Sequence, residues 1–139
     1  MSYENTMYAD TFVGAKVGEL YDAAEISKAV KKELIAMQKA GQFPAEIKFS
    51  VKSHKYAGGQ SVNVTVNGWT KEQVYTQEFY PQYNQTFNKT TPAAEAIIEK
   101  VEAVRNQYNR KAINSMIDYF NVTYYGRSQW DWRIEYNKI

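Results

Sequence analysis

The chain has 139 residues, 44% of them hydrophobic, and a formal net charge of +2, so it is long enough to bury one core and too nearly neutral to indicate nucleic-acid binding by charge alone. It contains no cysteine, which excludes disulfides, thiolate metal sites and thiol nucleophiles. Residues 1–10 are polar and no membrane-length apolar run is present, so we expect one cytoplasmic domain over residues 1–139 that does not enter a membrane.

The N-terminal part of the chain predicts a strand and then a helix. Residues 11–18 are short, β-prone and closed by glycine, which favours a strand. Asp22 and Glu25 have the spacing of a capping box, and apolar residues then recur at helical intervals until Gly41 and Pro44 end the helix. The members of this apolar stripe are Ile26, Val30, Leu34 and Met37.

The period changes to two over residues 46–56 and again over residues 61–67. Apolar side chains alternate there with polar ones, and residues 57–60 include two glycines that suit a tight turn. This region therefore predicts a β-hairpin with one buried face. Thr70 is placed to cap a short helical turn through Val74.

Residues 75–91 show no clean period and combine Tyr, Phe, Gln and Asn with one proline, so we expect a long connection, a kind of segment that is often functional or mobile. Thr91 and Pro92 then open a second helix. Its apolar stripe is Ala94, Ile97, Val101, Val104 and Tyr108. The apolar spacing continues through Ile113, either in the same helix or after a break near Asn109.

Near the C-terminus, β-prone residues on both sides of Gly126 predict a second hairpin over residues 121–136, with Trp130 and Trp132 on one core-facing side. Together these elements predict an α+β fold. We expect an antiparallel sheet of two hairpins, with or without the N-terminal strand, covered on one face by the two long helices.

One stretch of the sequence carries a family resemblance. Its pattern consists of Phe43-Pro44, Phe49-Ser50-Val51-Lys52-Ser53, Tyr56, Gly58-Gly59, Ser61-Val62, Val64 and Gly68, together with the preceding helix and Met116-Ile117-Asp118. Over roughly half the chain, this pattern resembles one of the large polyvalent protein-associated domains of phages and other mobile elements. The resemblance implies a mobile-element setting, where accessory proteins act on nucleic acid or on host defence proteins, and it implies no particular activity.

The first hairpin carries a basic candidate site at Lys48, Lys52 and Lys55, beside His54 and Tyr56. Lysines repeated along a strand can follow a phosphate backbone, and Tyr56 can stack on a base. The alternative interpretation is an ordinary solvated face whose lysines protect a strand edge from aggregation. His54 is the only histidine; with no nucleophile or orienting carboxylate nearby in the sequence, we expect it to be an exposed residue near the turn.

The expected connection carries a second, aromatic candidate site: Tyr75, Phe79, Tyr80, Tyr83 and Phe87. Aromatic side chains supply contact area at low entropic cost. A protein-binding surface and a loop pinned to the core by its aromatics are equally consistent with this pattern.

Catalytic motifs are not found in the sequence. Glu46 and Lys48 have the E-x-K spacing of a metal-dependent nuclease, but the second acid is not nearby. We therefore expect a protein without enzymatic activity, metal or cofactor. The leading hypothesis is an accessory protein of a phage or related element that contacts a protein partner, for instance to inhibit a host defence complex. The alternative is nucleic-acid binding through the basic hairpin and the first helix, which carries Lys28, Lys31 and Lys32.

Overall fold

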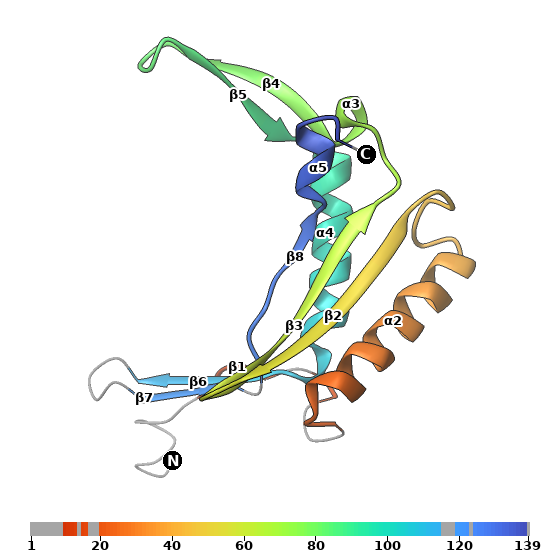
Figure 1. Cartoon of the computed structure of the whole chain (residues 1–139), viewed down its shortest axis with the longest axis vertical. Helices are drawn as coiled ribbons and strands as arrows, with labels where there is room; N and C mark the ends of the chain where they lie inside the picture. Colours follow the sequence, from red (N-terminus) through yellow and green to blue (C-terminus); the bar gives the residue numbers. More distant parts are fainter. Residues whose placement is uncertain (1–9, 14, 17–19, 115–118, 123, 139) are drawn as a thin grey trace.

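The computed structural model describes residues 10–13, 15–16, 20–114, 119–122 and 124–138, and it confirms the α+β class (Figure 1). The helices are α2 (Ala23–Lys39), α3 (Lys71–Val74), α4 (Pro92–Arg105) and α5 (Trp132–Glu135), with a 3-10 turn η1 (Asn106–Tyr108). The strands are β1 (Asp10–Val13), β2 (Lys48–Tyr56), β3 (Gly59–Asn67), β4 (Tyr75–Tyr80), β5 (Gln85–Thr90), β6 (Arg110–Asn114), β7 (Tyr119–Val122) and β8 (Ser128–Trp130). In the described residues they form the sheets β1-β6-β7, β2-β3-β8 and β4-β5.

Helix α2 begins where the sequence predicts, because the Asp22 side chain accepts a hydrogen bond from the backbone N–H of Glu25 at 3.3 Å. Its buried stripe packs against β2 and β3 and includes Ile26, Val30 and Leu34. Gly41 follows with φ at +86°, a left-handed conformation that glycine adopts without strain and that ends the helix.

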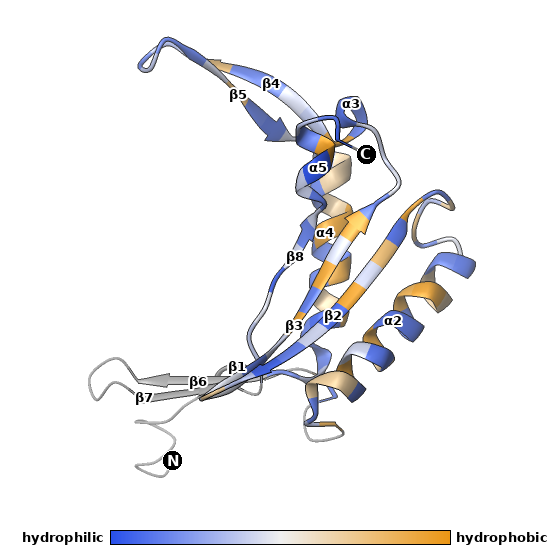
Figure 2. Ribbon diagram, viewed as in Figure 1, coloured by the Kyte–Doolittle hydropathy of each residue, from blue (hydrophilic) through white to orange (hydrophobic). Residues whose placement is uncertain are grey.

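Strands β2 and β3 form the predicted hairpin and pair along their whole length. Val62, Val64 and Val66 are fully buried on the face that α2 and α4 cover. Phe49 and Val51 share this face because they lie directly opposite Val66 and Val64. The intervening positions are polar and lie on the opposite face, so apolar and polar residues alternate along β3 from Ser61 and along β2 as far as Val51; the turn half of β2 is hydrophilic (Figure 2).

The third strand of this sheet, β8, runs parallel to β3, with Val64 opposite Ser128. The segment before β8 approaches β3 very closely at Gly126, where a Cβ would stand 2.0 Å from the carbonyl oxygen of Val62. Gly126 has φ at +140°, so both the space and the backbone conformation at this position require glycine.

The prediction of a hairpin over residues 121–136 is wrong. Strand β7 pairs with β6, β8 pairs with β3, and Asp131 accepts a hydrogen bond from the Arg133 N–H to cap α5. Trp130 is buried and its Nε1 donates to the carbonyl oxygen of Ala94, whereas Trp132 is 58% exposed. The apparent alternation came from a strand that ends between the two tryptophans and a helical turn that follows it.

The expectation of a long connection over residues 75–91 is also wrong, because these residues form the β4-β5 hairpin. Asn84 takes φ at +50° in the turn. Neither strand has a buried residue, so no apolar face was needed and the sequence shows no period of two. The second hairpin of the fold thus lies before α4 instead of after it.

Helix α4 ends at Arg105, and the 3-10 turn leads into β6. Of the two alternatives, the helix is therefore interrupted near Asn109 and does not continue through Ile113. The Asn109 side chain fixes this break, since its amide donates to the Tyr124 carbonyl oxygen at 3.0 Å and its oxygen accepts from the Tyr124 N–H at 3.2 Å. A strand is present in the predicted N-terminal region, but β1 covers Asp10–Val13 instead of residues 11–18, and it pairs with β6 in a sheet separate from β2-β3-β8. The segment 116–118 of the family pattern lies outside the described residues.

Candidate functional site

The β4-β5 hairpin projects from the rest of the fold (Figure 1). Three of its aromatic side chains are largely exposed: Phe79 at 55%, Tyr83 at 66% and Phe87 at 43%. The Phe87 ring lies 5.4 Å from that of Tyr80 and 6.3 Å from that of Tyr83, between centroids. We call Tyr80, Tyr83 and Phe87 the tip cluster. Adjoining aromatic rings that remain in water are a feature of interaction surfaces.

The tip cluster shares one face of the hairpin with a pair of charged residues. Glu78 lies directly opposite Phe87, and its carboxylate accepts a hydrogen bond from the Tyr80 hydroxyl at 3.2 Å. The same carboxylate lies 3.3 Å from the Lys89 ammonium. The hydrogen bond from Tyr80 to Glu78 orients the Tyr80 ring beside Phe87.

The base of the hairpin is attached to the body of the protein. The Thr91 N–H donates to the Val74 carbonyl oxygen at 2.8 Å, and the Asn88 amide donates to the Glu135 carboxylate on α5 at 3.1 Å. Among the described residues, the ring contacts of the tip cluster are all within the hairpin itself. The hairpin is therefore anchored at one end and presents its other end to solvent.

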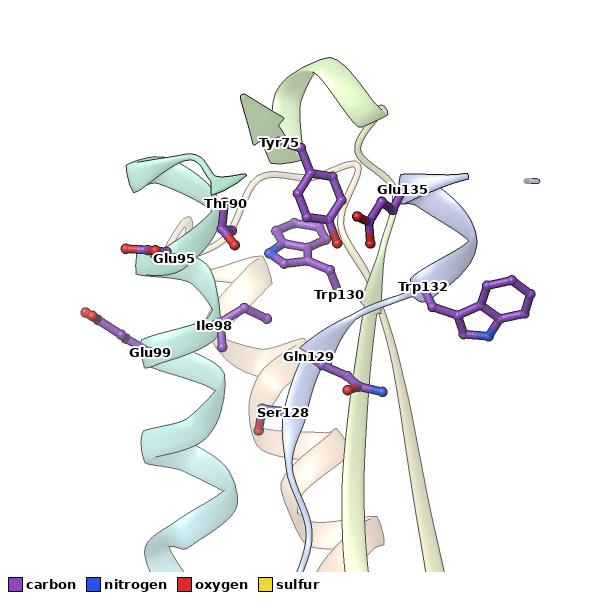
Figure 3. A pocket seen from close by; sticks show the side chains of 10 residues that line it. All are labelled: Tyr75, Thr90, Glu95, Ile98, Glu99, Ser128, Gln129, Trp130, Trp132 and Glu135. Atoms are coloured by element: carbon purple, nitrogen blue, oxygen red, sulfur yellow. The ribbon is translucent and has the colours of Figure 1, made fainter. Parts of the chain in front are cut away.

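A pocket of about 490 Å³ lies at the base of the hairpin (Figure 3). Tyr75, Ile98 and Trp130 supply apolar surface. Glu95, Glu99 and Glu135 also line it; the Glu135 side chain lies beside Tyr75, whereas the Glu95 and Glu99 side chains extend away from Tyr75 and Trp130 (Figure 3). Burial and the nearby Glu135 carboxylate raise the pKa of the Tyr75 hydroxyl, which stays a neutral donor at pH 7. Aromatic walls combined with carboxylates suit a cationic side chain.

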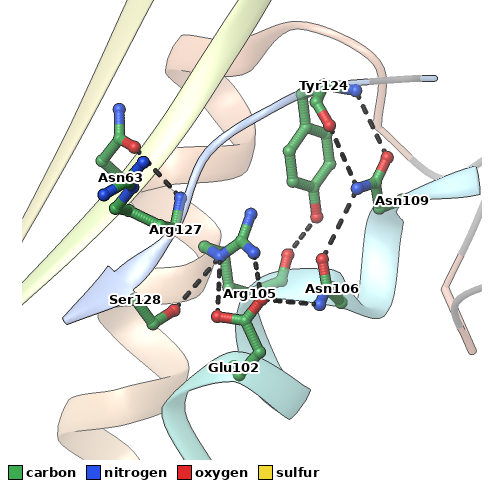
Figure 4. Close-up of polar contacts among 8 residues, drawn as sticks. All are labelled: Asn63, Glu102, Arg105, Asn106, Asn109, Tyr124, Arg127 and Ser128. Atoms are coloured by element: carbon green, nitrogen blue, oxygen red, sulfur yellow. Dashed lines mark hydrogen bonds and ion pairs between the residues drawn. The ribbon is translucent and has the colours of Figure 1, made fainter. Parts of the chain in front are cut away.

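A buried polar network holds the strand that forms one wall of this pocket (Figure 4). Arg105 is only 2% exposed; it pairs with Glu102, and its Nε donates to the Ser128 hydroxyl at 3.1 Å. Burial raises the pKa of Glu102, but hydrogen bonds from Arg105, Ser128 and Asn106 outweigh it and leave that pKa below its ordinary value. The Tyr124 hydroxyl donates to the Arg105 carbonyl oxygen. The network thus positions β8 against α4.

The structure separates the lysines of the basic candidate site. Lys48 and Lys52 lie on the uncovered sheet face, opposite Asn67 and Asn63. Lys55 follows the odd-numbered positions onto the helix-covered side, where it pairs with Asp22 at the start of α2. The grouping of Lys55 with the other two lysines is therefore wrong, because one residue along a strand reverses the direction of the side chain.

The helix lysines do not join this surface either. Lys28 and Lys32 lie two positions beyond the buried residues Ile26 and Val30, so they face away from the sheet. Because α2 covers the opposite side of the sheet, these lysines and Lys48 lie on different sides of the fold. Lys28 and Lys32 therefore do not form a single surface with Lys48 and Lys52.

His54 and Tyr56 are exposed, as the sequence predicts for residues near the turn, and their rings stack with centroids 5.8 Å apart. No hydrogen bond joins His54 to a carboxylate within the described part of the chain.

Two further findings concern metals and membranes. In the ranges that the structure describes, no group of three His, Cys, Asp or Glu side chains could hold a metal ion. Glu46, the acid of the E-x-K motif, accepts a hydrogen bond from the Trp69 indole at 2.9 Å. No helix within these same ranges is long and apolar enough to cross a bilayer.

Comparison with known proteins adds no family to this geometry: no family model matches the chain, and no match was found among curated proteins or solved structures. The resemblance of residues 43–68 to a polyvalent protein-associated domain therefore stays a prediction from the sequence. Function has to be argued from the sites themselves.

Proposed function

We propose that the protein is a non-enzymatic accessory protein of a phage or related mobile element that binds another protein through the β4-β5 hairpin. The observation that carries this proposal is the exposure of Tyr83 and Phe87, adjoining rings of the tip cluster, on a hairpin whose strands have no buried residue. A partner that covers these rings removes from water the apolar area that folding leaves exposed, which is the main favourable term in protein association.

The pocket at the base of the hairpin supports the same proposal. A basic side chain of the partner would be attracted by Glu135 and would stack on the Tyr75 ring, with Glu95 and Glu99 adding negative charge at the α4 side (Figure 3). The tip cluster would then supply apolar contact and the pocket would supply charge complementarity. Protein interfaces commonly combine an aromatic centre with polar groups around it.

The mobile-element setting rests on the resemblance of residues 43–68. Inhibition of a host defence complex is the form of the proposal that fits this setting, because it requires binding and no chemistry. It also agrees with a sequence in which we find no catalytic motif.

A site-specific photo-crosslinker tests the proposal directly. Benzoylphenylalanine replaces Tyr83 at the hairpin turn in one variant and Ile35, an exposed residue of α2, in a matched control. In cells of the host, we expect position 83 to crosslink one defined protein and position 35 to crosslink none. Mass spectrometry then identifies the crosslinked partner.

Binding of the purified partner provides the quantitative arm. Changing Tyr80 and Tyr83 to alanine should weaken the affinity about tenfold or more, because aromatic anchors at interfaces cost roughly 2 kcal/mol on truncation. Equal crosslinking from both positions, or unchanged affinity in the double variant, would show that the hairpin is not the docking element.

A further inference from the structure

The face of the β2-β3-β8 sheet that the helices leave uncovered carries a groove of about 480 Å³. Its lining comes from all three strands and from α5, and it includes Lys48, Ser50, Lys52, Thr65, Gln129 and Trp132. We call this surface the open face. It involves no residue of β4 or β5, and it shares only Gln129 and Trp132 with the pocket at the base of the hairpin.

The open face is positively charged. Lys48, Lys52 and Arg133 line the groove together with one carboxylate, that of Asp131. Arg133 holds this carboxylate with contacts of 2.6 to 3.2 Å, and these hydrogen bonds keep the pKa of Asp131 below its usual value. Neither Lys48 nor Lys52 has a carboxylate partner among the described residues. The two lysines are therefore available to an anion from outside the chain.

Aromatic rings stand at both ends of the open face. Trp132 is 58% exposed at the end near Lys48. At the other end, Gly59 lies between Tyr56 and Tyr125, since a Cβ on it would come within 3.2 Å of the Tyr56 ring and 3.4 Å of the Tyr125 ring. Exposed rings at the ends of a cationic strip offer stacking surface to planar groups.

We infer that the open face binds single-stranded nucleic acid, with Lys48 and Lys52 on phosphates and Trp132 stacked on a base. The two lysines are four residues apart on one strand face, or about 13 Å, so they can contact separate phosphates of one strand. Between them, the Ser50 and Thr65 hydroxyls and the Gln129 amide can bond to base edges. A duplex keeps its bases stacked inside and offers no free base to Trp132.

Fluorescence anisotropy of a labelled oligo-dT of about 12 nucleotides, a length within the site sizes of comparable grooves, tests the inference. We expect binding at low salt that weakens with salt at a logarithmic slope of about −1.4, since each of two neutralised phosphates contributes about −0.7. Trp132→Ala should weaken binding at least about fivefold through lost stacking. Changing Lys48 and Lys52 together to glutamate should abolish it.

The matched control changes Lys28 and Lys32 to glutamate, which alters the net charge equally on the far side of α2. This control should retain the wild-type affinity. Circular dichroism confirms that each variant is folded. No binding at low salt, equal weakening in both charge variants, or tighter binding to a duplex of the same length would each overturn the inference. The hairpin variants at Tyr80 and Tyr83 should bind the oligonucleotide normally, so this inference and the proposed function fail separately.

Discussion

The two hairpins β2-β3 and β4-β5 are both rich in β-prone residues, yet they have opposite surroundings. On β2-β3 one face is buried under two helices, and the end near the turn is fixed to α2 by the Lys55 and Asp22 ion pair. On β4-β5 neither strand has a buried residue, and the turn end carries an exposed aromatic cluster. The difference indicates that one hairpin carries the stability of the fold, while the other is free to serve recognition.

The largest effect should follow from truncating an apolar side chain of the helix that packs on the first hairpin. Leu34 is fully buried on α2, and Leu34→Ala should reduce the free energy of unfolding by about 2–5 kcal/mol, through lost burial and the cavity left behind. Urea denaturation followed by circular dichroism measures this change. A loss below about 1 kcal/mol would mean that the helix cover is not what stabilises the sheet.

The second-largest effect concerns β8, the strand that extends the sheet of the first hairpin by pairing with β3. Arg105→Met keeps most of the side-chain volume but removes the charged hydrogen bonds to Glu102 and Ser128, so we expect a loss of about 1.5–3 kcal/mol at pH 7. The folded-state pKa of Glu102 lies below its ordinary value of 4.5, so the stability that this carboxylate contributes is present above that value. It is lost as the pH falls through the folded-state pKa, so the difference in stability between wild type and variant should shrink there to the part contributed by the Ser128 hydrogen bond.

Exposed aromatics on the second hairpin should matter little for folding. Phe79→Ser should change the free energy of unfolding by less than about 0.5 kcal/mol, because the side chain is more than half exposed. Parallel denaturation curves of the wild type and the variant measure this difference. A destabilisation comparable to that of Leu34→Ala would show that the second hairpin belongs to the core. Both hairpins would then contribute to the stability of the fold.

The smallest effect tests how the first hairpin is fixed near its turn. The hydrogen bond from Lys55 lowers the pKa of Asp22, so Lys55→Gln should raise that pKa toward its ordinary value. Carbon-detected NMR titration of the Asp22 carboxyl group follows the change. Lys52→Gln, on the opposite sheet face, is the matched control and should leave the titration unaltered.

Local signals in the sequence predicted much of the fold. Side-chain caps at Asp22 and Thr91 mark both long helices, and the alternation that buries Val62 and Val64 marks the first hairpin. The second hairpin was missed because strands exposed on both faces need no alternation. Its exposed aromatics were nevertheless singled out from composition, and their role in binding stays a prediction.

The parts of the candidate sites that the sequence did not predict depend on long-range pairing. Trp132 and Glu135 reach their surfaces only because β8 runs parallel to β3, and residue spacing does not encode such a partner. Lys55 was misplaced for a different reason, since it follows the alternation of β2 to the covered side and finds Asp22 there. A sign of this was available in the sequence, because Lys55 lies three positions after Lys52, and an odd separation on an alternating strand places two side chains on opposite faces.

The parallel docking of β8 also has a consequence for synthesis of the protein on the ribosome. The first hairpin and α2 can form from residues that emerge together, whereas β8 must wait until the end of the described chain has been made. Until then, β3 is an unpaired edge with three valines, the kind of segment that promotes aggregation of nascent chains. The time taken to translate the residues after β3 therefore sets how long this edge stays unpaired in the nascent chain.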